Sequence, residues 1–192
     1  MPYYRATHLA FALGNLAEQV RVRWFRSAED EMRDVLLTDD ALHHLEYRAE
    51  RVRLLKERPL HEPPAELPMA LDRFREDFTD LIRACRERGL PVLVLTQPCL
   101  YSADMPPELS YYIGWTAKDG AYPPDVLERI IDEFNRVALE VCAAEQVDSL
   151  DLAAMVSKDL TTFCDDFHFN ISGNEKTAEI VADYFVKRAR SL

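Results

Sequence analysis

The chain has 192 residues, of which 48% are hydrophobic and 30% are charged, a composition typical of a globular protein with one buried core. Its net charge is −11, and an acidic surface repels phosphate, which argues against nucleic acid as a partner. No apolar run reaches the roughly 18 residues of a membrane span. The apolar patch 9–13 ends too early for a signal peptide. We therefore expect a cytoplasmic protein without a membrane span.

Two helices are predicted in the first 60 residues. Apolar side chains recur at intervals of three to four residues over 16–37 and again over 41–57, and Asp39 and Asp40 could cap the second helix. The proline-rich break at 61–68 is interpreted as a loop.

A third helix is predicted over about 69–88, with a buried strand directly after it. Gly89 is placed to end this helix. The predicted inner face of the helix consists of apolar side chains: Met69, Leu71, Phe74, Phe78, Leu81, Ile82 and Cys85. The continuous apolar run Val92–Leu95 is typical of a strand that is buried on both faces.

A long loop over 98–123 follows the strand. It is rich in proline and aromatic residues, which are Tyr101, Tyr111, Tyr112, Trp115 and Tyr122. Loops of this length in compact domains are often functional. The aromatic side chains are interpreted either as packing or as a recognition surface.

The remaining chain predicts a helix over 124–145, a strand over Val147–Leu152 and a final helix over 173–189. Ser172 and Glu175 have the spacing of a capping box at the start of that last helix. The order of elements indicates an α/β fold with parallel strands joined by a right-handed crossover. Two strands are few for a stable parallel sheet.

The loop before the last helix contains the most informative pattern, in which Asp165 stands three residues before His168. A carboxylate at this spacing can accept the imidazole Nδ1–H, which fixes the tautomer and leaves Nε2 able to take a proton. The alternative is a surface loop whose polar side chains only satisfy backbone groups. The position after a strand favours a site, because open α/β sheets bind ligands at strand carboxyl ends.

The segment Asp165-Asp166-Phe167-His168-Phe169-Asn170-x-x-Gly173 resembles the last block of the SGNH/GDSL hydrolases. The strand 92–95 with its following Thr96-Gln97-Pro98, and the strand 147–152, resemble that family's last two strands. The resemblance covers roughly 70–190. It implies a flavodoxin-like three-layer α/β/α fold that hydrolyses small carboxylic esters without a cofactor.

In that family His168 would be the general base and Asp165 its orienting carboxylate, so these are the candidate catalytic residues. Gln97, Tyr101 and Trp115 would bind substrate, because the aromatic loop would form a wall of the acyl or alcohol pocket. Asp166 is expected to be solvated or to be an alternative partner of the imidazole.

The family's Gly-Asp-Ser and Gly-x-Asn-Asp blocks are not found in this sequence. Asp148-Ser149-Leu150 imitates the nucleophile block but lies inside a predicted strand, and Gly14-Asn15 is a poor oxyanion candidate. The sequence therefore predicts one SGNH-like domain over 1–192 with an incomplete parallel sheet. Residues 1–60 would be extra helices of a helical excursion, and 69–192 the C-terminal half of the α/β core.

Two functions remain open at this point. The first is a serine esterase to which this chain contributes the histidine and aspartate. The second is a truncated or diverged non-catalytic α/β module that binds a ligand or a partner chain. An incomplete sheet would leave an apolar strand edge, so we expect a homo-oligomer, association with a missing N-terminal segment, or poor solubility.

Metal and disulfide chemistry are not favoured by the sequence. Cys164, Asp165, Asp166 and His168 are too close together to converge on one ion, so no metal is predicted. The cysteines are widely spaced and form no C-x-x-C pair, so they are expected to be buried, reduced and inert; they are Cys85, Cys99, Cys142 and Cys164.

Overall fold

The computed structural model of the chain describes residues 39–107, 109, 113 and 117–190, with side chains from residue 46 onward. The chain divides into two compact units, residues 1–46 and 47–192. The helix predicted over 16–37 lies outside the described residues, as do Tyr111, Tyr112 and Trp115.

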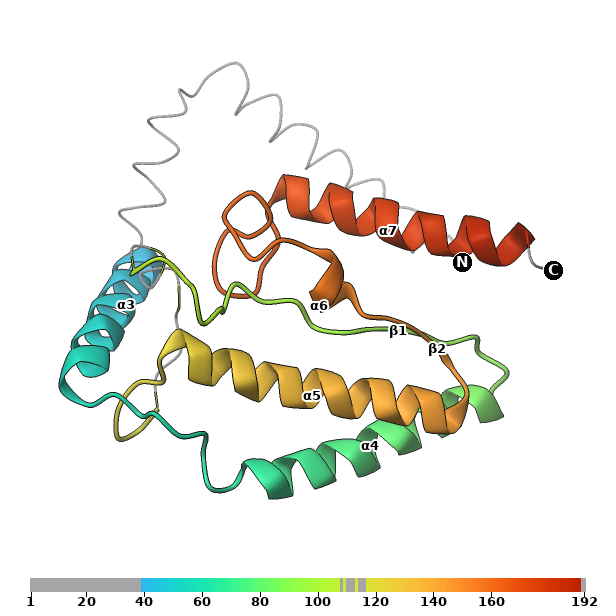
Figure 1. The fold of residues 1–192 in the computed structure, drawn as a ribbon, viewed down its shortest axis with the longest axis horizontal. Helices are drawn as coiled ribbons and strands as arrows, with labels where there is room; N and C mark the ends of the chain where they lie inside the picture. Colours follow the sequence, from blue (N-terminus) through green and yellow to red (C-terminus); the bar gives the residue numbers. More distant parts are fainter. Residues whose placement is uncertain (1–38, 108, 110–112, 114–116, 191–192) are drawn as a thin grey trace, which may run out of the picture. The chain divides into compact units, whose positions relative to one another are not determined.

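The described residues form a mixed α/β structure that is mostly helical (Figure 1). Its elements are α3 (Asp39–Glu57), α4 (Leu67–Glu87), β1 (Leu93–Leu95), α5 (Pro124–Glu145), β2 (Asp148–Leu150), α6 (Leu152–Met155) and α7 (Ile171–Arg190). β1 and β2 pair in parallel, as the sequence predicts, with Val94 opposite Ser149. Asp39 and Asp40 lie within α3 and do not precede it. A flavodoxin-like three-layer fold is not confirmed.

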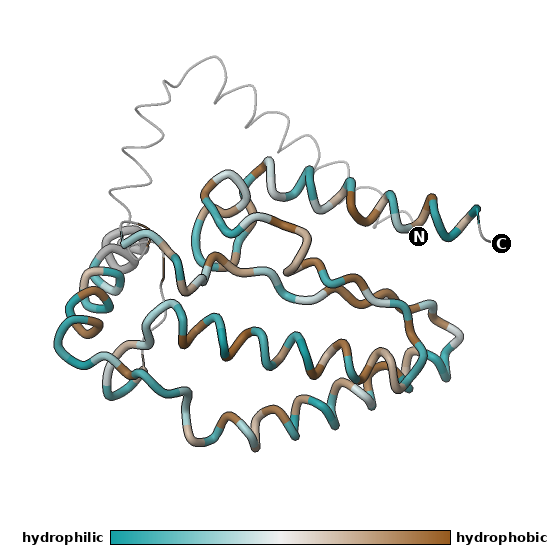
Figure 2. Tube along the Cα trace, viewed as in Figure 1, coloured by the Kyte–Doolittle hydropathy of each residue, from teal (hydrophilic) through white to brown (hydrophobic). Residues whose placement is uncertain are grey.

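Helices α4 and α5 pack against each other and cover one side of the two strands, while α7 runs along the other side (Figure 1). Apolar and polar residues alternate along α5 at helical spacing (Figure 2), which directs one face into the core. The ring of Phe74 stacks on Phe78 at 5.3 Å and meets the edge of Phe134 at 5.2 Å. The buried centre of this contact consists of Ile82, Val137, Val141 and Cys142.

The inner face predicted for α4 is correct in its centre and wrong at two positions. Ile82 is 1% exposed, whereas its neighbour Leu81 is 58% exposed and Met69 is 69% exposed. Successive helical residues point about 100° apart, so Leu81 leaves the face that Ile82 occupies. Gly89 ends the helix as predicted, with a left-handed φ of +67°. Leu90 N then donates to Cys85 O at 3.0 Å, which closes the turn.

The long segment 98–123 contributes more to the core than a surface loop would. Its described residues include Leu100 and Ile113, both with no exposed surface, and Ala121, which is equally buried. Tyr101 and Tyr122 pack with the first turns of α5. Ala121 also hydrogen-bonds with the residues that follow α3, since Leu60 N donates to Ala121 O at 2.9 Å. This packing connects α3 and α5.

Strand β1 is less buried than its apolar sequence predicts. Leu93 and Val94 are half-buried, and Leu95 is 38% exposed. Within the described residues, β2 is the only strand that pairs with β1. The expected burial on both faces is therefore wrong, because a cleft lined by Leu93, Asp148 and Tyr184 lies between the strands and α7. Among the described residues no helix is both long and apolar enough to cross a membrane.

Candidate active site

The Asp165–His168 pair lies in the loop between α6 and α7, and backbone hydrogen bonds connect the two sides of this loop. Cys164 N donates to His168 O at 2.9 Å, and Asn170 N donates to Thr162 O at 3.0 Å. The rings of Phe163 and Phe169 contact each other under these bonds, with centroids 5.2 Å apart. Phe163 is 1% exposed and belongs to the core cluster with Leu100, so the two ends of the loop are fixed to the protein interior.

The carboxylate of Asp165 organises the turn within this loop. Its Oδ1 accepts hydrogen bonds from Phe167 N at 3.0 Å and from His168 N at 2.8 Å. The same carboxylate reaches the imidazole, with 2.8 Å between His168 Nδ1 and Asp165 Oδ2 and 3.0 Å to Oδ1. The predicted contact between these side chains is therefore present. It arises because a short acidic side chain bonds the backbone two and three residues ahead of it.

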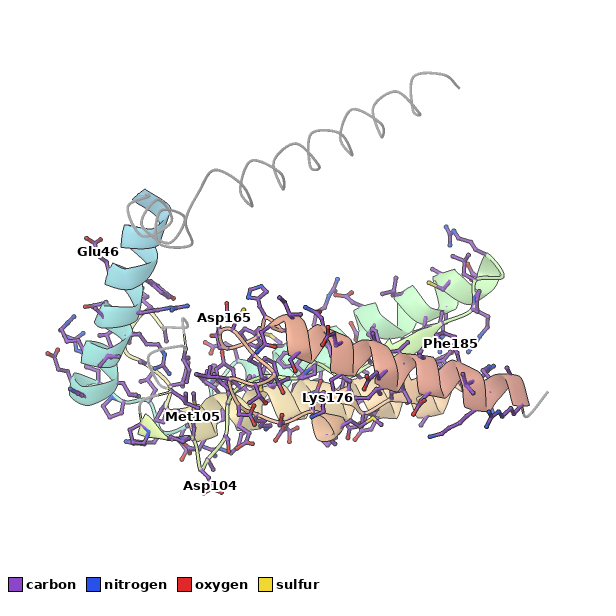
Figure 3. All side chains as sticks on the ribbon, turned by 90° about the horizontal axis from the view of Figure 1, so that it is seen from above. Glu46, Asp104, Met105, Asp165, Lys176 and Phe185 are labelled. Atoms are coloured by element: carbon purple, nitrogen blue, oxygen red, sulfur yellow. The ribbon has the colours of Figure 1, made fainter. Side chains whose placement is uncertain are left out.

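The imidazole is open to solvent, and its carboxylate partner is mostly covered. The His168 side chain is 80% exposed, and that of Asp165 is 23% exposed (Figure 3 labels Asp165). The hydrogen bond and charge of Asp165 raise the pKa of His168, and Asp166 raises it further. Burial alone would raise the pKa of Asp165, but the hydrogen bonds from His168 and Phe167 outweigh it and lower that pKa.

The start of α7 differs from the capping box that the sequence predicts. The helix begins at Ile171, and Asn170 Oδ1 accepts from Gly173 N at 2.9 Å. Asn170 is therefore the N-cap, and Ser172, which is exposed, lies within the first turn. A Cβ atom on Gly173 would stand 2.1 Å from Thr162 O, so only glycine lets α7 approach the loop this closely.

Asp166 is half-buried, and its carboxylate bonds to Tyr101, although its charge also raises the pKa of His168. Its Oδ2 accepts the hydroxyl of Tyr101 at 2.9 Å. Tyr101 is 1% exposed and packs in the core cluster with Ile113. Its ring is therefore covered, and its hydroxyl faces the loop of His168. The assignment of Tyr101 to substrate binding remains a prediction, as does that of Trp115, which lies outside the described residues.

Gln97 follows β1 and is exposed, and its backbone is held by a buried side chain of α5. Asn135 Oδ1 accepts from Gln97 N at 2.8 Å, and Asn135 Nδ2 donates to Gln97 O at 2.9 Å. Thr96 Oγ1 donates to Asp151 Oδ1 at 2.9 Å, which joins the carboxyl ends of β1 and β2. The sequence analysis missed Asn135, although an asparagine among apolar positions of a helix is a usable signal.

Asp151 also lines a cleft of about 380 Å³. The cleft lies between α5 and α6, and Asp132 and Lys158 contribute charged groups to it. The Lys158 ammonium pairs with Glu128 Oε1 at 2.5 Å. His168 does not line this cleft.

Two further expectations concern serine and cysteine. Ser149 lies in the middle of β2, as predicted, and is half-buried. Burial raises the pKa of the Cys99 thiol to about 11, as an inert cysteine requires, and Cys142 is buried too. The expectation of burial is wrong for Cys164, which is exposed and donates to His168 O at 3.3 Å, and Cys85 is only half-buried. The position of Cys164 beside the turn keeps its thiol at the surface.

Comparison of the chain with protein-family models, with curated proteins and with solved structures finds no match in any of the three.

Proposed function

We propose that this protein is an SGNH-type serine hydrolase of carboxylic esters, in which His168 is the general base and Asp165 orients it. The contact between Asp165 Oδ2 and His168 Nδ1 carries this proposal. It places a carboxylate on one imidazole nitrogen while the ring stays exposed, which is the arrangement that activates a hydroxyl. The substrate would be a small ester, and no cofactor takes part.

The proposed reaction has two acyl-transfer steps. A serine Oγ attacks the ester carbonyl carbon, and its proton moves to Nε2 of His168. The imidazolium, stabilised by Asp165, returns that proton to the leaving alkoxide as the C–O bond breaks. Water then attacks the acyl-serine with the same histidine as base, which releases the acid and the free serine. The proposal assigns His168 and Asp165 only, and it leaves the serine and the oxyanion donors unassigned.

The test is an assay of the full chain with p-nitrophenyl acetate and butyrate, together with a fluorophosphonate probe. We expect turnover, a labelled serine located by mass spectrometry, and loss of both in His168→Ala. His61→Ala is the matched control, because His61 is an exposed histidine between α3 and α4 and should keep full activity. Turnover that survives in His168→Ala, or a chain that shows neither turnover nor label, contradicts the proposal.

The alternative function is a non-catalytic α/β module that binds a partner chain, and one observation favours it. β1 pairs only with β2 among the described residues, and Leu95 on this strand is 38% exposed. An apolar strand with one open edge can pair with a strand of a second copy or of another polypeptide. Light scattering tests this association, and a monodisperse monomer that stays soluble at high concentration contradicts it.

A further inference from the structure

A buried charge lies on the core side of the His168 loop. Arg51 of α3 has no exposed surface, and its Nη2 donates to Tyr122 O at 2.9 Å. A guanidinium removed from water is costly unless negative charge compensates it. The structure must therefore place acidic or polar groups around Arg51.

One carboxylate that acts electrostatically on Arg51 belongs to the His168 loop. Burial lowers the pKa of Arg51, and electrostatic interactions with Tyr101, Asp166 and Tyr47 oppose that effect. Asp166 is the carboxylate in this group. The buried charge of Arg51 in α3 is thus coupled electrostatically to Asp166, the residue next to Asp165.

Asp166 has two direct attachments to the segment after β1. Its side-chain Oδ2 accepts the Tyr101 hydroxyl at 2.9 Å, and its backbone oxygen accepts Leu100 N at 2.9 Å. The ring of the next residue, Phe167, meets the ring of Tyr101 edge to face at 5.2 Å and 84°. These contacts fix the backbone directly after Asp165. The position of that backbone determines whether the Asp165 carboxylate can reach the imidazole of His168.

We propose that Asp166 is a positioning residue, fixed by its hydrogen bonds with Tyr101 and Leu100, which keeps the carboxylate of Asp165 on Nδ1 of His168. The loop presents two consecutive aspartates with separate tasks. Asp165 faces the exposed imidazole, and Asp166 bonds to the buried Tyr101. The role given to the imidazole rests on the proposed esterase function, but the coupling of Arg51, Tyr101 and Asp166 to His168 does not.

Asp165 and Asp166 both raise the pKa of His168, and Asp165 has the larger effect. Asp166 in turn accepts a hydrogen bond from Tyr101 of the segment after β1. It also interacts electrostatically with Arg51 of α3. Loosening Asp166 weakens the Asp165–His168 contact, so the pKa of His168 falls toward its ordinary value.

The experiment is an NMR titration of the His168 imidazole in the full chain, with the signal assigned by its absence in His168→Ala. Tyr101→Phe removes one hydroxyl and keeps the ring against Phe167. We expect it to shift the His168 titration to lower pH, and Asp166→Asn to shift it further. Asp165→Asn gives the reference for complete loss of the orienting carboxylate.

Tyr184→Phe is the matched control, because it removes a tyrosine hydroxyl on α7 that accepts from Arg188 at 3.1 Å. It should leave the His168 titration at the wild-type position. If Tyr101→Phe and Tyr184→Phe both titrate like wild type, while Tyr101→Phe only lowers thermal stability, then the network is structural and the proposal is overturned. A shifted titration in a chain without esterase turnover would keep the coupling and refute the function instead.

The contribution of Arg51 is tested separately by a double-mutant cycle of Arg51→Met and Asp166→Asn, followed by urea unfolding. If Arg51 and Asp166 are coupled, the double variant loses less unfolding free energy than the sum of the losses in the two single variants. The reason is that each single substitution leaves an uncompensated charge. If the two losses are additive, Arg51 does not contribute to the positioning of Asp166.

Discussion

The Nδ1 atom of His168 lies 2.8 Å from Oδ2 of Asp165, and the same carboxylate caps the backbone turn on which the histidine stands. One side chain therefore shapes the turn and holds the imidazole ring. The ring stays 80% exposed in this arrangement. Because Asp165 has both roles, the geometry of the Asp165–His168 pair can be tested by titration of His168 as well as by enzymatic activity.

The first prediction concerns pH. Asp165 raises the pKa of His168, so a reaction that needs the neutral imidazole should increase in rate as pH rises through a value above the ordinary 6.5 or so of histidine. Asp165→Asn should move this inflection to lower pH and reduce kcat. The measurement is kcat/KM for p-nitrophenyl acetate from pH 5 to 9, and an unchanged inflection in Asp165→Asn would contradict the assignment.

The same pKa shift affects stability. Because the pKa is raised in the folded state, the stabilisation by protonated His168 is complete below the unfolded pKa and disappears as pH rises through the folded pKa. Thermal unfolding of the wild type and of His168→Ala should therefore differ more at pH 5 than at pH 9. Equal differences at the two pH values would contradict the raised pKa of His168.

A second prediction concerns the contact between α7 and the loop. Gly173→Ala places a methyl group against Thr162 O, and forcing the two apart should cost about 1–3 kcal/mol of unfolding free energy. In an ordinary helix the same substitution is stabilising. Urea unfolding measures the change. Lys176→Ala, at an exposed position in the same helix, should remain within about 0.5 kcal/mol of wild type. A more stable Gly173→Ala would refute the close approach.

A third prediction distinguishes the two candidate caps of α7. Asn170 accepts from Gly173 N, so Asn170→Ala should lower the unfolding free energy by about 1 kcal/mol. Ser172→Ala should change it by less than about 0.5 kcal/mol, because Ser172 is an exposed residue of the first turn. The two variants are compared by urea unfolding. The opposite ranking would restore the capping box that the sequence suggests.

A fourth prediction uses two adjacent residues of α4. Ile82→Ala removes a side chain that is 1% exposed, and the resulting cavity should cost about 2–5 kcal/mol. Leu81→Ala removes a side chain that is 58% exposed, and its effect should be several times smaller. Both are measured by urea unfolding at one pH. Equal losses would mean that Leu81 is covered in solution, for instance by a partner chain.

The local patterns of the sequence predicted much of the secondary structure. The helical period of α4 and α5, the stop at Gly89 and the parallel pair β1–β2 all follow from short-range spacing and from one crossover. The predicted strand 147–152 proved shorter, because Asp151 turns back to cap α6. That hydrogen bond competes with strand extension, and a period of two cannot reveal it.

The Asp165–His168 contact could be predicted because the two residues are three positions apart and meet within one turn. The surroundings of Asp166 could not, because Tyr101, which donates a hydrogen bond to it, and Arg51, whose pKa it raises, are distant in sequence. The sequence by itself thus determined the long helices α3, α4, α5 and α7, the two strands and the contact between Asp165 and His168, which are local interactions. The tertiary structure alone decided which polar side chains are buried beside that dyad, since burial depends on contacts between segments that are far apart in the chain.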